Sequence, residues 1–271
     1  MRYLALLCVV TVLLAAPAQA TLQDGTTAYE RGDYAGAMAA WMPLAEQGLT
    51  QAQYNVGALY FDGLGVPRDV ESAAQWFARA AEGGHFMSQY NIGVMYYTGV
   101  GVAQDHGEAA KWIGRAAQQG FHVAQFDLGT MYVKGEGVPL DYAAAVTWFS
   151  EAAWQGNVKA QFNLGNMHYM GRGVAQDDTI AATWFRRAAE QGHAGAQHRL
   201  AVMYYDGAGM ERNLARAFLW FGLAAAQGDT VAAHNRDIVL TEMSSDQLAE
   251  AQQLANEWMA ADPFHPAGTA H

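Results

Sequence analysis

Apolar positions along the chain recur at helical spacing. Between about Gln51 and Phe61, four apolar residues fall at i, i+4, i+7 and i+8, which places Ala52, Val56, Leu59 and Tyr60 on one helical face. A second stretch ends at Gly83-Gly84, and its apolar positions are Ala73, Ala74, Trp76, Phe77, Ala80 and Ala81. The pattern predicts two helices separated by a turn at Gly63-Leu64-Gly65, because glycine accepts the positive φ of a helix C-cap.

This two-helix pattern repeats with a period of 36 residues. Five glycine pairs keep the spacing, from Gly63/Gly65 to Gly207/Gly209, as do closing glycines from Gly48 to Gly228. The same register holds for Trp76, Trp112, Trp148, Trp184 and Trp220, for paired alanines from Ala80/Ala81 to Ala224/Ala225, and for Asp33, Asp69, Asp105, Asp141, Asp177 and Asn213. The acidic column is predicted to cap the second helices. Since one repeat cannot bury both faces alone, stacked repeats predict an all-α solenoid.

The fourth repeat carries a family resemblance. Ala160-Gln161-Phe162-Asn163-Leu164-Gly165 is followed by Gly171-Arg172-Gly173-Val174, Asp177, Trp184-Phe185, Ala188-Ala189 and Gln191-Gly192-His193. This segment resembles the Sel1-like repeat, a relative of the tetratricopeptide repeat, and the resemblance covers about Tyr29 to Asp237. It implies a right-handed α-solenoid superhelix and favours protein binding over catalysis.

The ends depart from the repeat, as terminal caps should. We expect a solenoid over residues 21–243, with an N-terminal partial repeat at 24–48 and 36-residue repeats from about 49. A C-terminal capping helix is predicted over 244–262, begun by a capping box of Ser244 and Gln247. A flexible tail is expected over 263–271.

Residues 1–20 have the pattern of a signal peptide. Arg2 precedes an apolar run from Leu4 to Ala16, and Ala18-Gln19-Ala20 forms a small-x-small cleavage site after Ala20. The run is too short for a lasting membrane span, so no stable membrane insertion is expected after cleavage. Because Cys8 is the one cysteine and no glycosylation sequon occurs, we expect a bacterial periplasmic or secreted protein without disulfides.

Composition narrows the classes of partner and chemistry. Apolar residues make up 52% and charged residues 15%, with 15 Lys+Arg against 26 Asp+Glu. A net charge of −11 argues against nucleic acid as a partner. No serine lies in a Ser-x-x-Lys or Gly-x-Ser-x-Gly motif, and no His-Glu-x-x-His spacing occurs. We therefore predict no catalytic residues, no metal site and no cofactor, although His198 and His234 share a column that leaves a two-histidine site as an alternative.

A helical wheel centred on Val56 places a candidate binding face on the opposite side of each first helix. By the tetratricopeptide resemblance, this face would line a concave groove. The predicted partner-binding residues are Tyr54, Asn55, Tyr90, Asn91, Phe126, Asp127, Phe162, Asn163, His198 and Arg199. Packing of the aromatic members between repeats is the alternative. Two further columns vary most among repeats and could set specificity, namely Ala58, Val94, Thr130, Asn166 and Val202, and the turn residues Leu64, Val100, Glu136, Arg172 and Ala208.

The function expected from these features is a non-enzymatic periplasmic adaptor that binds another protein in the groove, in envelope signalling or polysaccharide-related assembly. One alternative is a peptidoglycan or glycan binder, since aromatic and amide side chains also suit sugars. A penicillin-binding or β-lactamase-like enzyme of the same family is a further alternative, disfavoured by the missing motifs. A eukaryotic lumenal adaptor is disfavoured by the absent sequons and retention signal.

Overall fold

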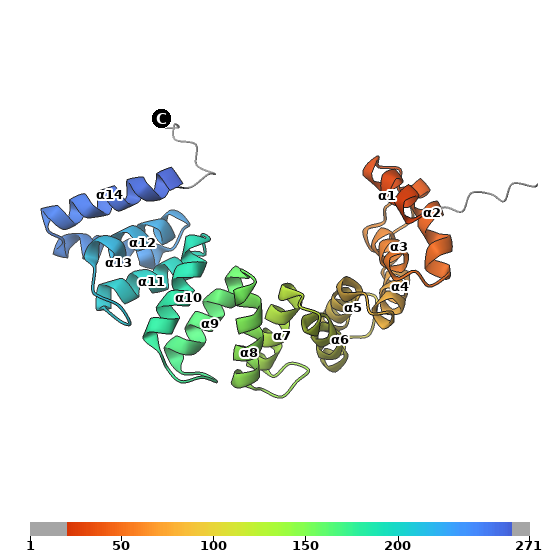
Figure 1. The fold of residues 1–271 in the computed structure, drawn as a ribbon, viewed down its shortest axis with the longest axis horizontal. Coiled ribbons are helices and arrows are strands. Elements are labelled where there is room, and N and C mark those ends of the chain that lie inside the picture. Colours follow the sequence, from red (N-terminus) through yellow and green to blue (C-terminus); the bar gives the residue numbers. More distant parts are fainter. Residues whose placement is uncertain (1–20, 262–271) are drawn as a thin grey trace, which may run out of the picture. The chain divides into compact units, whose positions relative to one another are not determined.

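The computed structural model describes residues 21–261, which form 14 α-helices and no strand (Figure 1). The predicted signal peptide at 1–20 and the predicted tail at 263–271 lie outside the described residues. The chain divides into two compact units, with unit 1 ending at Gly83 and unit 2 beginning at Gly84. The all-α solenoid expected from the sequence is confirmed, since helices pack mainly against their neighbours in the chain.

Unit 1 contains the N-terminal partial repeat and the first full repeat. Its helices are α1 (Leu22–Glu30), α2 (Tyr34–Glu46), α3 (Thr50–Asp62) and α4 (Val70–Glu82). Helix α1 has nine residues where the other three have 13, and Thr21 and Asp24 close a capping box at its start. The indole Nε1 of Trp41 donates a 3.1 Å hydrogen bond to the carbonyl of Leu22, which fastens α1 to α2.

Unit 2 contains the other four full repeats and the C-terminal helices. Its helices are α5 (Phe86–Thr98), α6 (His106–Gln118), α7 (His122–Lys134), α8 (Tyr142–Trp154), α9 (Val158–Met170), α10 (Asp178–Glu190), α11 (Ala194–Asp206), α12 (Leu214–Ala226), α13 (Thr230–Glu242) and α14 (Ser245–Ala261). Each odd-numbered helix from α5 to α11 packs against the helix that follows and, from α7 on, against the helix that precedes it. The first helices α7, α9 and α11 are therefore enclosed on two sides.

The predicted second-helix caps are confirmed. The acidic or amide side chain at each N-cap accepts a hydrogen bond from a backbone N–H in the first turn, at Asp33, Asp69, Asp105, Asp141, Asp177 and Asn213. Such a bond satisfies one of the N–H groups that a helix start leaves without an intrahelical partner.

Small alanines and one large aromatic column form the core between helices. The paired alanines are fully or almost fully buried in four repeats, and Phe149 and Phe185 are among the largest buried side chains. The tryptophan column is less uniform than its spacing suggests. Trp112, Trp184 and Trp220 are buried, whereas Trp76 and Trp148 are only half-buried.

Helix α14 packs across α12. The Ser244 hydroxyl and the Gln247 side chain exchange hydrogen bonds with each other's backbone N–H, so the predicted capping box is confirmed. Ala251 is buried, and the Trp258 ring meets Trp220 edge to face at 5.0 Å between centroids. Helix α13 keeps Val231 58% exposed, so part of its apolar surface remains accessible in the described chain.

Candidate functional site

The predicted aromatic column lies against the second helices. The Phe126 ring is 5.8 Å from Phe149, and the Phe162 ring is 5.8 Å from Phe185. Both contacts join a first helix to the second helix of the same repeat. Phe162 also stacks on His193 at 4.5 Å. These rings are half-buried, and much of their area serves packing within the repeat.

The candidate residues of unit 1 follow the same arrangement. The Tyr54 ring is 5.8 Å from Phe77, and burial raises the pKa of the Tyr54 hydroxyl. Asn55 accepts a 3.0 Å hydrogen bond from the Gln51 side chain one turn earlier on α3. Both candidates are half-buried on α3.

A hollow of about 260 Å³ lies along α5 and α7 in unit 2. Its rim carries Tyr90 and Asp127, whose hydroxyl and carboxylate are 2.8 Å apart. Tyr97 and Glu136 form a second pair at 2.5 Å, and Lys134 lies 3.6 Å from the same carboxylate oxygen. The remaining lining residues are Val94, Ile113, Thr130 and Met131. The hollow thus combines an apolar wall with two carboxylates, two phenols and one ammonium.

The two carboxylates have different environments. Burial raises the pKa of Asp127, although the Tyr90 hydroxyl and the Lys159 charge oppose this shift. The hydrogen bond from Tyr97 lowers the pKa of Glu136, and Lys134 lowers it further. Glu136 is therefore ionised throughout the neutral range, and its charge at the turn end of the hollow is paired with the Lys134 ammonium.

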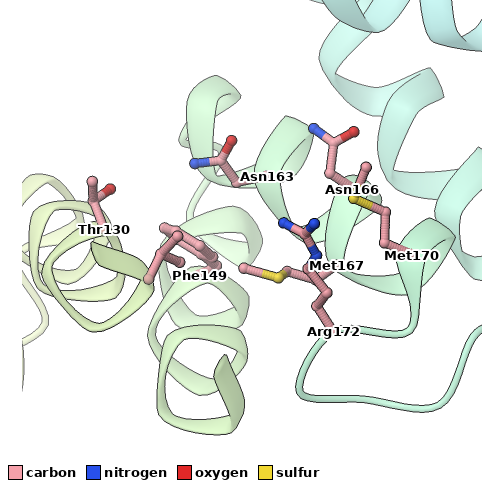
Figure 2. A pocket seen from close by; sticks show the side chains of 8 residues that line it. Thr130, Phe149, Asn163, Asn166, Met167, Met170 and Arg172 are labelled. Atoms are coloured by element: carbon pink, nitrogen blue, oxygen red, sulfur yellow. The ribbon is translucent and has the colours of Figure 1, made fainter. Parts of the chain in front are cut away.

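A second hollow of about 120 Å³ adjoins the first and shares Thr130 with it. Figure 2 shows the amides of Asn163 and Asn166 on one side and the Met167 thioether pointing toward Phe149. The Arg172 guanidinium lies beside Met167 and brings positive charge (Figure 2). The remaining lining residues are Val133 and Met170. We call these two cavities the paired hollows; most of their helical lining comes from α5, α7 and α9, with Ile113 from α6 and Phe149 from α8.

The structure gathers only part of the predicted set into one site. Tyr90, Asp127 and Asn163 line the paired hollows, whereas Asn91 is half-buried on α5 and lines neither. His198 pairs with Asp229, with its Nδ1 2.7 Å from the carboxylate. Arg199 lies over the Tyr169 ring, 5.9 Å from its centroid.

The variable columns contribute more to the hollows than the aromatic columns do. Val94, Thr130 and Asn166 come from one of these columns, and Glu136 and Arg172 come from the other. Lys134 and Met170 share a further column that sequence reasoning did not single out. The change from a charged to an apolar side chain at the last position of the first helix could have indicated that this column contributes to the hollows.

Neither a metal-binding cluster nor a membrane-spanning helix occurs in the part of the chain that the structure describes. Within residues 21–261, no group of three or more His, Cys, Asp or Glu side chains could hold a metal ion. His198 pairs with a carboxylate rather than with His234. None of the helices α1–α14 combines the length and apolar character that a membrane span requires.

The family model of the Sel1 repeat matches residues 50–85, 87–121, 122–157, 158–193 and 194–229. These segments cover more than half of the chain and agree with the 36-residue register of the helices. No curated protein matches the chain.

Two solved structures share the fold at substantial identity. One is c5321, a protective antigen of uropathogenic Escherichia coli strains with an SLR fold, at 36% identity and a TM-score of 0.77. The match covers 88% of this chain and 52% of that protein, so this chain spans about half of its length. The other is a Sel1 repeat protein from Oxalobacter formigenes, at 30% identity and a TM-score of 0.76, covering 88% of this chain and 99% of that one.

Proposed function

This chain belongs to the Sel1-repeat family, whose members generally mediate protein–protein interaction, and we propose that it is a non-enzymatic adaptor that binds a partner protein through the paired hollows. The observation that carries the proposal is the convergence of repeat-variable side chains on one surface of unit 2. Thr130, Asn166, Glu136 and Arg172 occupy positions that differ from repeat to repeat, yet all line these two cavities. Residues that the fold does not dictate are free to serve recognition.

The chemistry of the hollows suits an extended peptide segment of the partner. The carboxylates of Asp127 and Glu136 favour a basic side chain in the larger hollow. Arg172 favours an acidic or polar side chain in the smaller one, where Met167 and Met170 add adaptable apolar contact. The amides of Asn163 and Asn166 can bond to the backbone of the segment between them.

We place this adaptor in the bacterial periplasm, with a role in envelope signalling or polysaccharide-related assembly. The support is the Arg2, Leu4–Ala16 and Ala18-Gln19-Ala20 pattern together with the absence of cysteine after Cys8. Periplasmic fractionation of the full-length protein, with N-terminal sequencing of the product, tests the location. An N-terminus at Thr21 supports it, and an intact N-terminus in the cytoplasm contradicts it.

Glycan binding is the second candidate and has weaker support. Sugar-binding sites commonly present the free face of an aromatic ring, whereas the Phe126 and Phe162 rings pack on Phe149 and Phe185. Co-sedimentation with purified peptidoglycan measures this alternative directly.

The adaptor proposal is tested by capture and then by reconstitution. A photo-crosslinking amino acid at Asn163 in the native host should yield a defined protein adduct, and the same label at the exposed Thr147 of α8 should not. The captured protein is then purified, and its affinity is measured by isothermal titration calorimetry.

A triple variant of Asp127→Ala, Asn163→Ala and Asn166→Ala should weaken this affinity at least about tenfold, since each polar contact contributes about 1 kcal/mol. A matched variant of Thr147→Ala and Thr183→Ala changes exposed hydroxyls that bond only to their own helices, and it should bind as the wild type does. Unchanged affinity in the triple variant, with its fold intact by circular dichroism, contradicts the proposal.

A further inference from the structure

A third hollow, of about 440 Å³, lies among α10, α11, α12 and α14 and shares no residue with the paired hollows. Trp258 and Leu254 of α14 form one wall, and Leu219 and Trp220 of α12 form another. Because α14 is not a repeat helix, no other repeat of the described chain has this wall.

Two arginines converge in this hollow on one buried oxygen. Arg186 donates from Nη2 and Arg216 from Nη1 to the hydroxyl of Tyr204, each at 3.1 Å. The two guanidinium nitrogens are therefore separated by at most twice that distance. Tyr204 itself is only 5% exposed, so its hydroxyl is a fixed point for both side chains.

The repeat does not require either arginine. Tyrosine occurs at the Tyr204 position in most repeats, but the position of Arg186 is Ala78, Gly114 and Ser150 in earlier repeats. The position of Arg216 is Ser72, Glu108, Ala144 and Ile180. Arg186 and Arg216 are thus both specific to their repeats, and both contact the Tyr204 hydroxyl although helix stacking does not require either side chain.

These like charges lie close together without an ion pair. Neither guanidinium bonds to a carboxylate within the described residues. Each retains several N–H donors in a fork that fits a carboxylate, and an anion between them would relieve their mutual repulsion. Glu190 and Glu257 line the same hollow, so its lining carries two positive and two negative charges.

We propose that this hollow binds a small zwitterion with an apolar side chain, of the α-amino acid class, free or as a dipeptide. The carboxylate lies between Arg186 and Arg216, and the ammonium faces Glu190 and Glu257. The apolar side chain packs on Trp220 and Trp258, which meet edge to face. The volume suits this class, since small-molecule sites commonly measure about 300–1,000 Å³.

Calorimetric titration of the full chain with L-leucine, L-phenylalanine and leucyl-leucine tests the proposal. N-acetyl-leucine lacks the ammonium and leucine amide lacks the carboxylate, so each should bind at least about tenfold more weakly than leucine. Tighter binding of leucyl-leucine than of leucine identifies a dipeptide as the preferred ligand, and tighter binding of leucine identifies a free amino acid. Equal binding of N-acetyl-leucine and leucine overturns the zwitterion, and no binding of any probe up to about 10 mM overturns the site.

Substitutions of the two arginines test whether the probes bind in this hollow. Arg186→Gln and Arg216→Gln should each lower the affinity for the tightest probe at least about tenfold. The matched control is Arg115→Gln on α6, where the guanidinium lies over Trp112 at 4.4 Å, and this variant should bind normally. Glu190→Gln serves as a second variant if an arginine variant unfolds. Unchanged affinity in the folded Arg186→Gln and Arg216→Gln variants overturns the assignment.

Discussion

The Gln191 side chain donates a 2.8 Å hydrogen bond from Nε2 to Oε1 of Gln161, which lies 30 residues earlier on the first helix of the same repeat. Gln161 is 3% exposed, and its own Nε2 donates at 3.2 Å to the carbonyl of Ala153 near the end of α8. The arrangement recurs around Gln125 and Gln197. Each buried amide is therefore satisfied on both sides and joins one repeat to the next.

Replacing Gln161 with Leu should lower the free energy of unfolding by about 1–3 kcal/mol. The substitution removes the hydrogen bond to the carbonyl of buried Ala153 and the acceptor of the Gln191 amide, and the loss is greatest at Ala153 because Gln191 is exposed and also donates to the Arg187 carbonyl. The urea midpoint measures the loss. Gln118→Leu at the exposed end of α6 is the control and should change the midpoint little. Equal effects of the two changes would show that the buried amide contributes nothing specific.

Gly165 allows the Phe185 ring to pack directly on α9. A Cβ at this position would lie 2.7 Å from Cδ1 of Phe185, which is fully buried. Gly165→Ala gains about 0.5–1 kcal/mol in helix propensity but costs about 1–3 kcal/mol in overpacking, so the net change should be destabilising. Thermal unfolding of Gly165→Ala, Phe185→Leu and the double variant checks this, because the double loss should be smaller than the sum. A rise in midpoint for Gly165→Ala alone would refute the packing argument.

Gly135 and Gly137 look equivalent in the sequence but have different roles. Both adopt positive φ, at +71° and +72°. A Cβ at Gly137 would clash severely with the backbone carbonyl of His106, whereas the nearest atom to a Cβ at Gly135 is 3.4 Å away, at an ordinary contact distance. Gly135→Ala should cost about 1–2 kcal/mol of backbone strain. Gly137→Ala should cost at least about 2 kcal/mol more, because backbone must move. Parallel urea titrations rank the two, and the reverse order would contradict the clash.

His193 links the stability of α9 and α11 to pH. Its Nδ1 accepts a 3.1 Å hydrogen bond from the Ala196 N–H as the N-cap of α11, and its ring stacks on Phe162. Burial lowers the pKa of His193 from its ordinary value of 6.5. The unfolded chain therefore binds this proton more readily than the folded chain does. The stabilisation is present above pH 6.5 and is lost as the pH falls toward the folded pKa.

His193→Asn should retain the cap and remove this pH dependence. Asn157 already caps α9 with its side-chain oxygen 3.0 Å from the Ala160 N–H, so an amide fits the position. The urea midpoint should fall less between about pH 7.5 and about pH 5.5 in the variant than in the wild type. An identical fall in both proteins would show that other groups carry the pH response.

The regular part of the fold follows from the sequence, because its determinants are local. Asp177 precedes an apolar helical face and caps α10 as predicted, and Ala188 is fully buried as its small size requires. The burial of Gln161 does not follow from its residue type, because a polar side chain indicates solvent exposure. Its recurrence every 36 residues, three positions before Leu164 on the buried face, was a usable signal.

The candidate site was harder to place from sequence. A single helical wheel assumes one buried face, but α9 packs against both α8 and α10. Phe162, opposite the assumed core, therefore meets Phe185. The meeting of Tyr97 with Glu136, 39 residues apart, depends on how one repeat's turn lies beside the previous helix. Spacing within one repeat does not contain that information.

Packing almost entirely between chain neighbours has a mechanical consequence for unit 2. Under tension applied along the chain, a terminal repeat can detach without disturbing those beyond its neighbour. Residues 158–193, once pulled straight, span about 120 Å. An optical trap should therefore record a staircase of similar extensions rather than one abrupt rupture. Unit 2 can therefore lengthen in steps under load while its remaining repeats stay folded.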